Sequence, residues 1–213
     1  MQKCKRCLRL SMGLLLSVVA VLAVLSGTST VHAAPGVSGD DQNLDSFDSQ
    51  VLDLARTCAS NVTRELEKLL DSNRLTEDQL FDTFYIPIPN TSPQKFNTQY
   101  DKFTDEVLIG ILDSCLGKDQ RLVFAVAVDV NGYLPTHNSK FSKPLTDNQD
   151  YNTKNNRTKR MFNDKTGITA AKNTRSFLLQ TYPRDTGQNM YDMSVPIMIR
   201  GKHWGAIRIG YEH

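Results

Sequence analysis

The chain has 213 residues and a formal net charge of +2. Four of its positive charges and none of its negative ones fall within residues 1–33, so the rest of the chain carries a charge of −2. That length fits one domain with its own core. A charge so close to neutral gives no electrostatic reason to expect nucleic acid or an anionic membrane as a partner.

Residues 1–33 are predicted to be a secretory signal peptide. A basic n-region precedes the apolar stretch Met12–Leu25, which is short for a spanning helix, and Val31-His32-Ala33 offers small residues for cleavage. We therefore expect a periplasmic or secreted protein, cut after Ala33. An uncleaved N-terminal membrane anchor is the alternative that stays open. The basic residues of the n-region are Lys3, Lys5, Arg6 and Arg9.

Of the four cysteines, Cys4 and Cys7 lie in the leader, which leaves Cys58 and Cys115 in the exported part. Disulfides persist outside the cytoplasm, so a Cys58–Cys115 bridge is predicted. The alternative is a pair of buried thiols that pack as small apolar groups.

Residues 34–43 form a Gly/Ser/Asp-rich spacer, and a long amphipathic helix is predicted to follow, with Asp45 or Ser46 as its N-cap. Its apolar side chains recur three or four positions apart. This stripe can pack on its own domain or pair with a second copy in a homodimer, and the sequence leaves both open. The stripe consists of Leu44, Phe47, Val51, Leu54, Cys58, Val62, Leu66 and Leu69.

The rest of the predicted helical region, residues 44–118, contains two further helices and a loop. Thr76 is expected to cap a short helix that ends near Phe84, and Pro87–Pro93 is expected to be a loop. A further helix is predicted from about Thr98 to Leu116, with Gly117 as its stop.

Residues 119–213 are predicted to form the sheet region. Val123–Asn138 contains an Asn131-Gly132 step between two apolar runs, which predicts a hairpin whose second strand ends at His137-Asn138. Tyr151–Phe162 has helical spacing, and His203-Trp204-Gly205 is expected to be a turn into the last strand. The fold class is therefore α+β, with an antiparallel sheet of about five strands. The last three strands are expected at Phe177–Tyr182, Met190–Ile199 and Trp204–Tyr211.

Five short motifs, in this order, resemble the periplasmic PAS/Cache-like sensor domain of bacterial methyl-accepting chemotaxis proteins. Each motif alone is weak, but together they span nearly all of the chain after the leader. The motifs are Phe84-Tyr85-Ile86-Pro87-Ile88-Pro89, Asp129-Val130-Asn131-Gly132-Tyr133-Leu134-Pro135-Thr136-His137-Asn138, Asn156-Arg157-Thr158-Lys159-Arg160, Phe177-Leu178-Leu179-Gln180-Thr181-Tyr182 with Arg184-Asp185, and His203-Trp204-Gly205.

The resemblance implies extracytoplasmic sensing of a small molecule, with the ligand between the sheet and residues 151–172. No second spanning segment follows the leader, so we expect signalling through a membrane-bound partner. Some relatives carry a covalent c-type haem on Cys-x-x-Cys-His. Leu8 follows the Cys-x-x-Cys of this chain, which excludes that attachment. A noncovalent haem on His137 or His203 stays an alternative, and no cofactor is predicted.

Arg157 and Arg160 are candidate ligand-binding residues because a planar guanidinium suits a carboxylate or phosphate. On the expected helix they would share one face. The structural alternative is a solvated basic face, paired with Asp150 or Asp164.

The other candidate binding residues are expected near the ends of strands. Tyr182 can stack on or hydrogen-bond a ligand, and His137 can titrate near neutral pH or coordinate a metal. Arg184 and Asp185 have a structural alternative as an ion pair, and His137 has one as a turn-stabilising hydrogen bonder. The full set is Tyr133, His137, Asn138, Tyr182, Arg184 and Asp185.

No catalytic constellation is apparent. Asp185-Thr186-Gly187 matches the aspartic-protease triplet, but a single copy cannot form the required pair of carboxylates. The sequence also lacks a Gly-x-Ser-x-Gly elbow and any His or carboxylate cluster with metal-ligand spacing. We therefore expect a non-enzymatic sensor for a small anionic or zwitterionic ligand. The alternative is an interaction subunit without a ligand, for which the long helix would be the docking surface.

Overall fold

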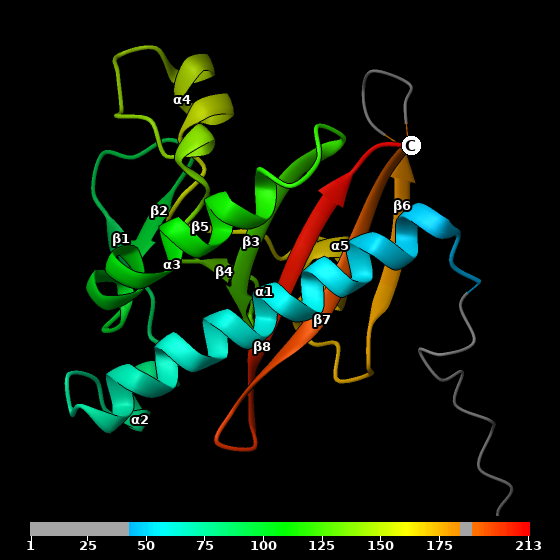
Figure 1. The fold of residues 1–213 in the computed structure, drawn as a ribbon. Helices are drawn as coiled ribbons and strands as arrows, with labels where there is room; N and C mark the ends of the chain where they lie inside the picture. The colour runs from blue at the N-terminus through cyan, green and yellow to red at the C-terminus, as the bar shows by residue number, and fades with distance from the viewer. Residues whose placement is uncertain (1–42, 184–188) are drawn as a thin grey trace, which may run out of the picture. The chain divides into compact units, whose positions relative to one another are not determined.

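The computed structural model describes residues 43–183 and 189–213, all of which belong to one unit, Val37–His213. The predicted signal peptide, nearly all of the spacer, Arg184 and Asp185 lie outside the described residues. In chain order the elements are α1 (Ser46–Asp71), α2 (Glu77–Leu80), β1 (Ile86–Ile88), β2 (Lys95–Asn97), α3 (Asp101–Leu116), β3 (Leu122–Asp129), β4 (Tyr133–Leu134), a 3₁₀ turn (Ser139–Phe141), α4 (Gln149–Asn155), β5 (Arg160–Met161), α5 (Lys165–Ala171), β6 (Leu178–Pro183), β7 (Asn189–Ile199) and β8 (Lys202–Tyr211) (Figure 1).

The main sheet has four antiparallel strands in the order β3-β8-β7-β6. The α+β class is confirmed, but the expected fifth strand is missing from this sheet because the chain after β3 does not fold back on it. The short strand β4 pairs with β5 instead. Gly132 has a φ of 80° and Asn131 is not left-handed, so the predicted hairpin turn is wrong.

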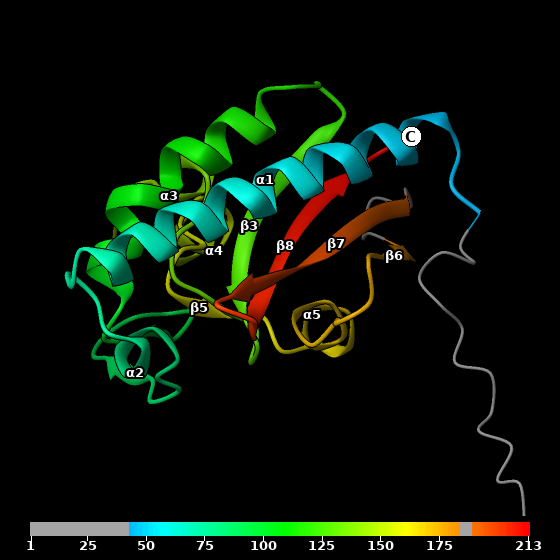
Figure 2. The same cartoon turned by 60° about the horizontal axis from the view of Figure 1, so that its bottom comes forward.

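Two long helices cover one face of this sheet, and α5 lies on the other (Figure 2). Asp45 is the N-cap of α1, as predicted, and its carboxylate accepts the N–H groups of Phe47 and Asp48 at 2.7 and 2.8 Å. The apolar stripe of α1 is buried against β7, β8 and α3. This stripe therefore packs within the domain, and the homodimer stays a prediction.

The region between α1 and β3 is partly as predicted. Thr76 caps α2, although the helix ends at Leu80 rather than near Phe84. The expected Pro-rich loop is the turn of a small hairpin, because β1 pairs with β2 on either side of it. Helix α3 ends at Leu116 with Gly117 as its C-cap, as predicted.

The helix expected over Tyr151–Phe162 is wrong in its second half. Helix α4 ends at Asn155, and Lys159 is left-handed with a φ of 59°. The reason is tertiary: Lys95, 61 residues earlier in the chain, donates its ammonium group to the carbonyl oxygens of Asn156 and Thr158. These contacts hold the carbonyls of residues 156 and 158 toward Lys95, in a backbone conformation that does not continue α4.

The turn before the last strand lies at Arg200-Gly201, where φ is 48° and 79°, rather than at His203-Trp204-Gly205. Two consecutive left-handed residues match the twist of a two-residue hairpin. Trp204 is the extra residue of a bulge opposite Ile197 and Met198, which sends its ring into the helix-side core. Its Nε1 donates to the Leu80 carbonyl at 3.0 Å.

Within residues 43–183 and 189–213, no helix combines the length and the apolar character that crossing a bilayer requires.

Cys58 on α1 and Cys115 on α3 are both buried free thiols in contact. The hydrogen bond between them raises the pKa of Cys58, and burial adds to this effect. The sequence prediction that these two side chains meet is confirmed, whereas the bond between them stays a prediction.

We expect oxidation to join the two sulfurs in the exported protein. A non-reducing digest should then contain one cross-linked peptide that holds both Cys58 and Cys115. Reduction should lower the free energy of unfolding by about 4 kcal/mol, because the bond closes a long loop. A digest in which both peptides are found separately before reduction would contradict the disulfide.

Candidate functional site

A pocket of about 340 Å³ lies on the face of the sheet that α1 and α3 do not cover. Strands β3 and β8 form its floor, and the β4–β5 region and the start of α5 form its walls. This volume is at the lower end of the range for small-molecule sites. The lining residues are Phe124, Val126, Val128, Leu134, His137, Arg157, Phe162, Asp164, Thr166, Tyr182 and Arg208.

Arg208 is the charged group in the floor of this pocket. Its side chain is 9% exposed, and its Nε and Nη2 donate to the carboxylate of Asp192, which is fully buried in β7. Burial disfavours the charged guanidinium, but the neighbouring carboxylate outweighs this effect and keeps the pKa of Arg208 above its ordinary value. Asp192 therefore holds Arg208 charged and fixes one edge of its fork.

The remaining nitrogen of Arg208, Nη1, is free to bind a ligand. Among the described residues it has no hydrogen-bond acceptor, and it approaches α5 at Gly167. A Cβ on Gly167 would lie 3.4 Å from Nη1 and only 2.1 Å from the carbonyl oxygen of Phe162. The absence of a side chain there lets the wall and the guanidinium come this close. A charged donor that faces the pocket favours an anionic or carbonyl oxygen above it.

His137 supplies a second donor. Its Nδ1 accepts the backbone N–H of Asn138 at 2.7 Å, so the neutral ring carries its proton on Nε2. Burial and the nearby charges of Arg157 and Arg160 lower its pKa to about 3. The ring is therefore neutral near pH 7, which leaves His137 the hydrogen-bonding role that was the alternative to titration.

Arg157 lines the pocket, and Arg160 lies beside it. Their guanidinium carbons are 5.2 and 5.1 Å from the centre of the Phe162 ring. They do not share a helical face, since both follow the end of α4. Burial lowers the pKa of Arg160, and the charge of Arg157 adds to this effect. Positive charge is thus gathered at this wall of the pocket.

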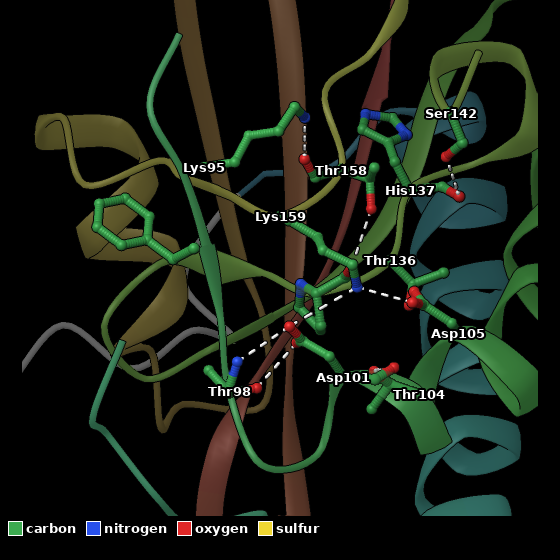
Figure 3. Close-up of polar contacts among 12 residues, drawn as sticks. Lys95, Thr98, Asp101, Thr104, Asp105, Thr136, His137, Ser142, Thr158 and Lys159 are labelled. Carbon is green, nitrogen blue, oxygen red and sulfur yellow. Dashed lines mark hydrogen bonds and ion pairs between the residues drawn. The ribbon is translucent and has the colours of Figure 1, made fainter. Parts of the chain in front are cut away.

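Two lysines hold the segment that carries these arginines (Figure 3). Lys95 donates to the Thr158 carbonyl at 2.5 Å, and burial lowers its pKa to about 8, with help from Arg160 and Lys159. The Lys159 ammonium lies 2.7 Å from Asp105 and 3.7 Å from Asp101, both on α3. The wall of the pocket is thereby fixed to the helical layer.

Tyr182, at the end of β6, is the third predicted residue in the lining. Burial raises the pKa of its hydroxyl, and the charge of Asp192 adds to the effect. The hydroxyl forms no hydrogen bond with a described residue, so it can serve a ligand as donor or acceptor.

Two predicted binding residues have structural roles instead. Tyr133 is fully buried on the helix side, where its hydroxyl donates to the Phe96 carbonyl at 2.8 Å and contacts Asp101 at 3.0 Å. The Oδ1 of Asn138 accepts the N–H of Ala125 at 2.9 Å, which closes the free edge of β3. Neither lines the pocket. Arg184 and Asp185 lie outside the described residues.

Arg208 and Asp192 were not predicted from the sequence, although the sequence contains a pattern that indicates them. Each is a charged residue inside a run otherwise suited to a buried strand. Opposite charges in two neighbouring buried strands predict a buried ion pair, since an isolated buried charge is very costly.

His137 is the one histidine among the described lining residues, and its Nε2 carries the ring proton. His203 does not belong to that lining. Elsewhere, Asp45, Asp48 and His213 gather near the start of α1, but both carboxylates already serve the capping box.

Comparisons with known proteins give little more. No protein-family model and no curated protein matches the chain. One similar structure is an extracellular ligand-binding receptor of Desulfohalobium retbaense, at 14% identity and a TM-score of 0.35, covering 80% of this chain and 26% of that one. Another is the ligand-binding domain of the amino acid chemoreceptor PctC of Pseudomonas aeruginosa in complex with GABA, at 13% identity and a TM-score of 0.28, covering 77% and 63%. A C-terminal domain from Streptococcus mutans has 10% identity and a TM-score of 0.27, covering 61% and 92%. Scores this low carry no argument for fold or function.

We expect Arg208→Met to lower the free energy of unfolding by about 3–5 kcal/mol, because it leaves the Asp192 carboxylate buried without a partner. The double variant Asp192→Leu/Arg208→Met removes both charges and should recover most of this loss. Urea unfolding of the unchanged protein, Arg208→Met and the double variant measures both effects. Lys172→Met, at an exposed position, is the control. A double variant no more stable than Arg208→Met would show that the buried pair is not the cause.

His137 should make stability depend on pH between about 3 and 6.5, its folded and ordinary pKa values. In that window the unfolded chain binds more protons, so stability rises with pH, by up to about 1.4 kcal/mol per unit, and is lost as pH falls. The free energy of unfolding, measured in urea at a series of pH values, should depend less on pH in His137→Gln, by this slope. Parallel profiles of the two proteins would contradict a buried neutral His137.

Proposed function

We propose that this chain is an extracytoplasmic sensor domain that binds a small anionic or zwitterionic molecule in the sheet pocket. The observation that carries the proposal is Arg208, a buried guanidinium held by Asp192 with one nitrogen left toward the pocket. His137 and Arg157 place a further donor and a further charge at the same pocket. An anion at this nitrogen would form a charge-assisted hydrogen bond with the guanidinium.

A route from the pocket to the rest of the domain supports a reporting role. Three residues after Arg208 in β8, the hydroxyl of Tyr211 donates to Asp48 of α1 at 2.5 Å. His213 also contacts this carboxylate, at 3.1 Å. A ligand that favours one position of β8 would therefore shift the start of α1 as well. In the proposed function a membrane-bound partner senses this shift.

The alternative, an interaction subunit without a ligand, has less support. Its expected docking surface was the long helix, and the apolar stripe of that helix is buried in the core of the domain. A pocket lined by Arg208, His137 and Arg157 has no use in such a subunit.

The test is a titration calorimetry panel of acetate, succinate, glutamate, phosphate and neutral sugars. At least one anion should bind, and Arg208→Lys should weaken it by about tenfold or more, since a single ammonium nitrogen lacks the fork that holds Asp192 on one edge and presents another nitrogen to the ligand. Lys172→Ala, outside the pocket, should bind as the unchanged protein does.

Two results would contradict the proposal. One is a panel in which neutral compounds bind and no anion does. The other is an anion whose affinity is the same in Arg208→Lys and in the unchanged protein, which would place its site elsewhere.

A further inference from the structure

The apolar lining of the pocket is as specific as its charged group, Arg208. Val126, Val128 and Leu134 are fully buried around it, whereas Phe124 and Phe162 are only partly buried and pack against this small cluster. The pocket thus offers two aromatic side chains with uncovered surface. A ligand that covers them gains from the apolar area that it removes from water.

Phe124 lies next to Arg208 because the neighbouring strand makes room for its ring. Gly210 pairs with Phe124, and a Cβ there would lie 2.2 Å from the Cε1 atom of that ring. The ring therefore lies over β8, and the Arg208 guanidinium is 6.0 Å from its centre. An apolar platform and a charged donor stand side by side on the same two strands.

Among the described residues at the pocket, the donors suit a carboxylate and both carboxylates already accept hydrogen bonds. Asp192 is fully buried, and both of its oxygens accept from Arg208. Asp164 is exposed, and its Oδ1 caps α5 by accepting the N–H groups of Thr166 and Gly167 at 3.1 Å. An ammonium group brought into this pocket would lose its solvation without a free buried carboxylate among these residues to replace it.

We propose that the ligand is a monocarboxylate with a ring-sized apolar body and no ammonium group. Its carboxylate binds Arg208 Nη1 and the Nε2–H of His137, and its body covers the Phe124 ring. This class narrows the proposed function and rests on it. The pocket volume of about 340 Å³ suits a ligand of this size.

Four probes separate the features of this ligand in a calorimetric titration of the purified protein. Phenylacetate has the acid and the ring, 2-phenylethanol lacks the acid, phenylalanine adds an ammonium group, and acetate lacks the ring. We expect phenylacetate to bind at least tenfold more tightly than each of the other three.

The outcomes distinguish this class from the proposed function. If phenylalanine, acetate or succinate binds as tightly as phenylacetate, the apolar monocarboxylate is wrong while the anion site stands. If 2-phenylethanol binds equally well, the acid plays no part and both proposals fall. If no probe and no anion binds, both fall as well.

Two variants test the platform itself. Phe124→Leu keeps an apolar side chain but removes the ring, so phenylacetate should bind about threefold to tenfold more weakly and acetate should be unchanged. Gly210→Ala should push the ring into the pocket and also weaken phenylacetate. Phe103→Leu, which removes a ring on α3 outside the pocket, is the control.

Circular dichroism and urea unfolding check that each variant is folded. A folded Phe124→Leu and a folded Gly210→Ala that both bind phenylacetate with unchanged affinity would contradict a ligand that covers the Phe124 ring.

Discussion

The buried ion pair between Arg208 and Asp192 is the interaction on which the site depends. Both residues lie in central strands of the sheet, and the two side chains are almost completely out of water. Two ions are costly to bury, and their attraction offsets that cost only when the geometry is good. Here the carboxylate fixes one edge of the guanidinium, so a single nitrogen is presented at a fixed place in the pocket.

The two faces of the sheet differ in a way that explains why the pocket lies where it does. On one face α1 and α3 fill the space with a continuous core (Figure 2). The other face is covered by the seven-residue helix α5, the short β4–β5 pair and the segment that Lys95 and Lys159 hold in place. These small elements form walls but cannot fill the space between them. The helical face provides stability, and the thinly covered face provides the site.

Sequence patterns predicted the parts of the fold whose causes are local. The stripe and cap of α1 and the strands β6, β7 and β8 follow from spacing within each segment, and they were placed to within a few residues. The end of α4 was not predicted, because it is set by Lys95, far away in the chain. Tyr133 was assigned to the ligand site for a similar reason, since its partner Asp101 lies 32 residues before it.

For the candidate site, side-chain chemistry was a partial guide. His137, Arg157 and Tyr182 do meet at one pocket, but the residue that anchors it, Arg208, was missed. A charge inside an apolar strand was visible in the sequence. Its partner could have been inferred only by pairing β7 with β8 and comparing the residues that face the same side.

A crystal structure of the protein grown with phenylacetate would test the central claim most directly. We predict difference density for the carboxylate within hydrogen-bond distance of Arg208 Nη1, on the face of the sheet that carries α5. Density on the helical face, or a carboxylate bound elsewhere while the Arg208 nitrogen contacts only solvent, would contradict the account.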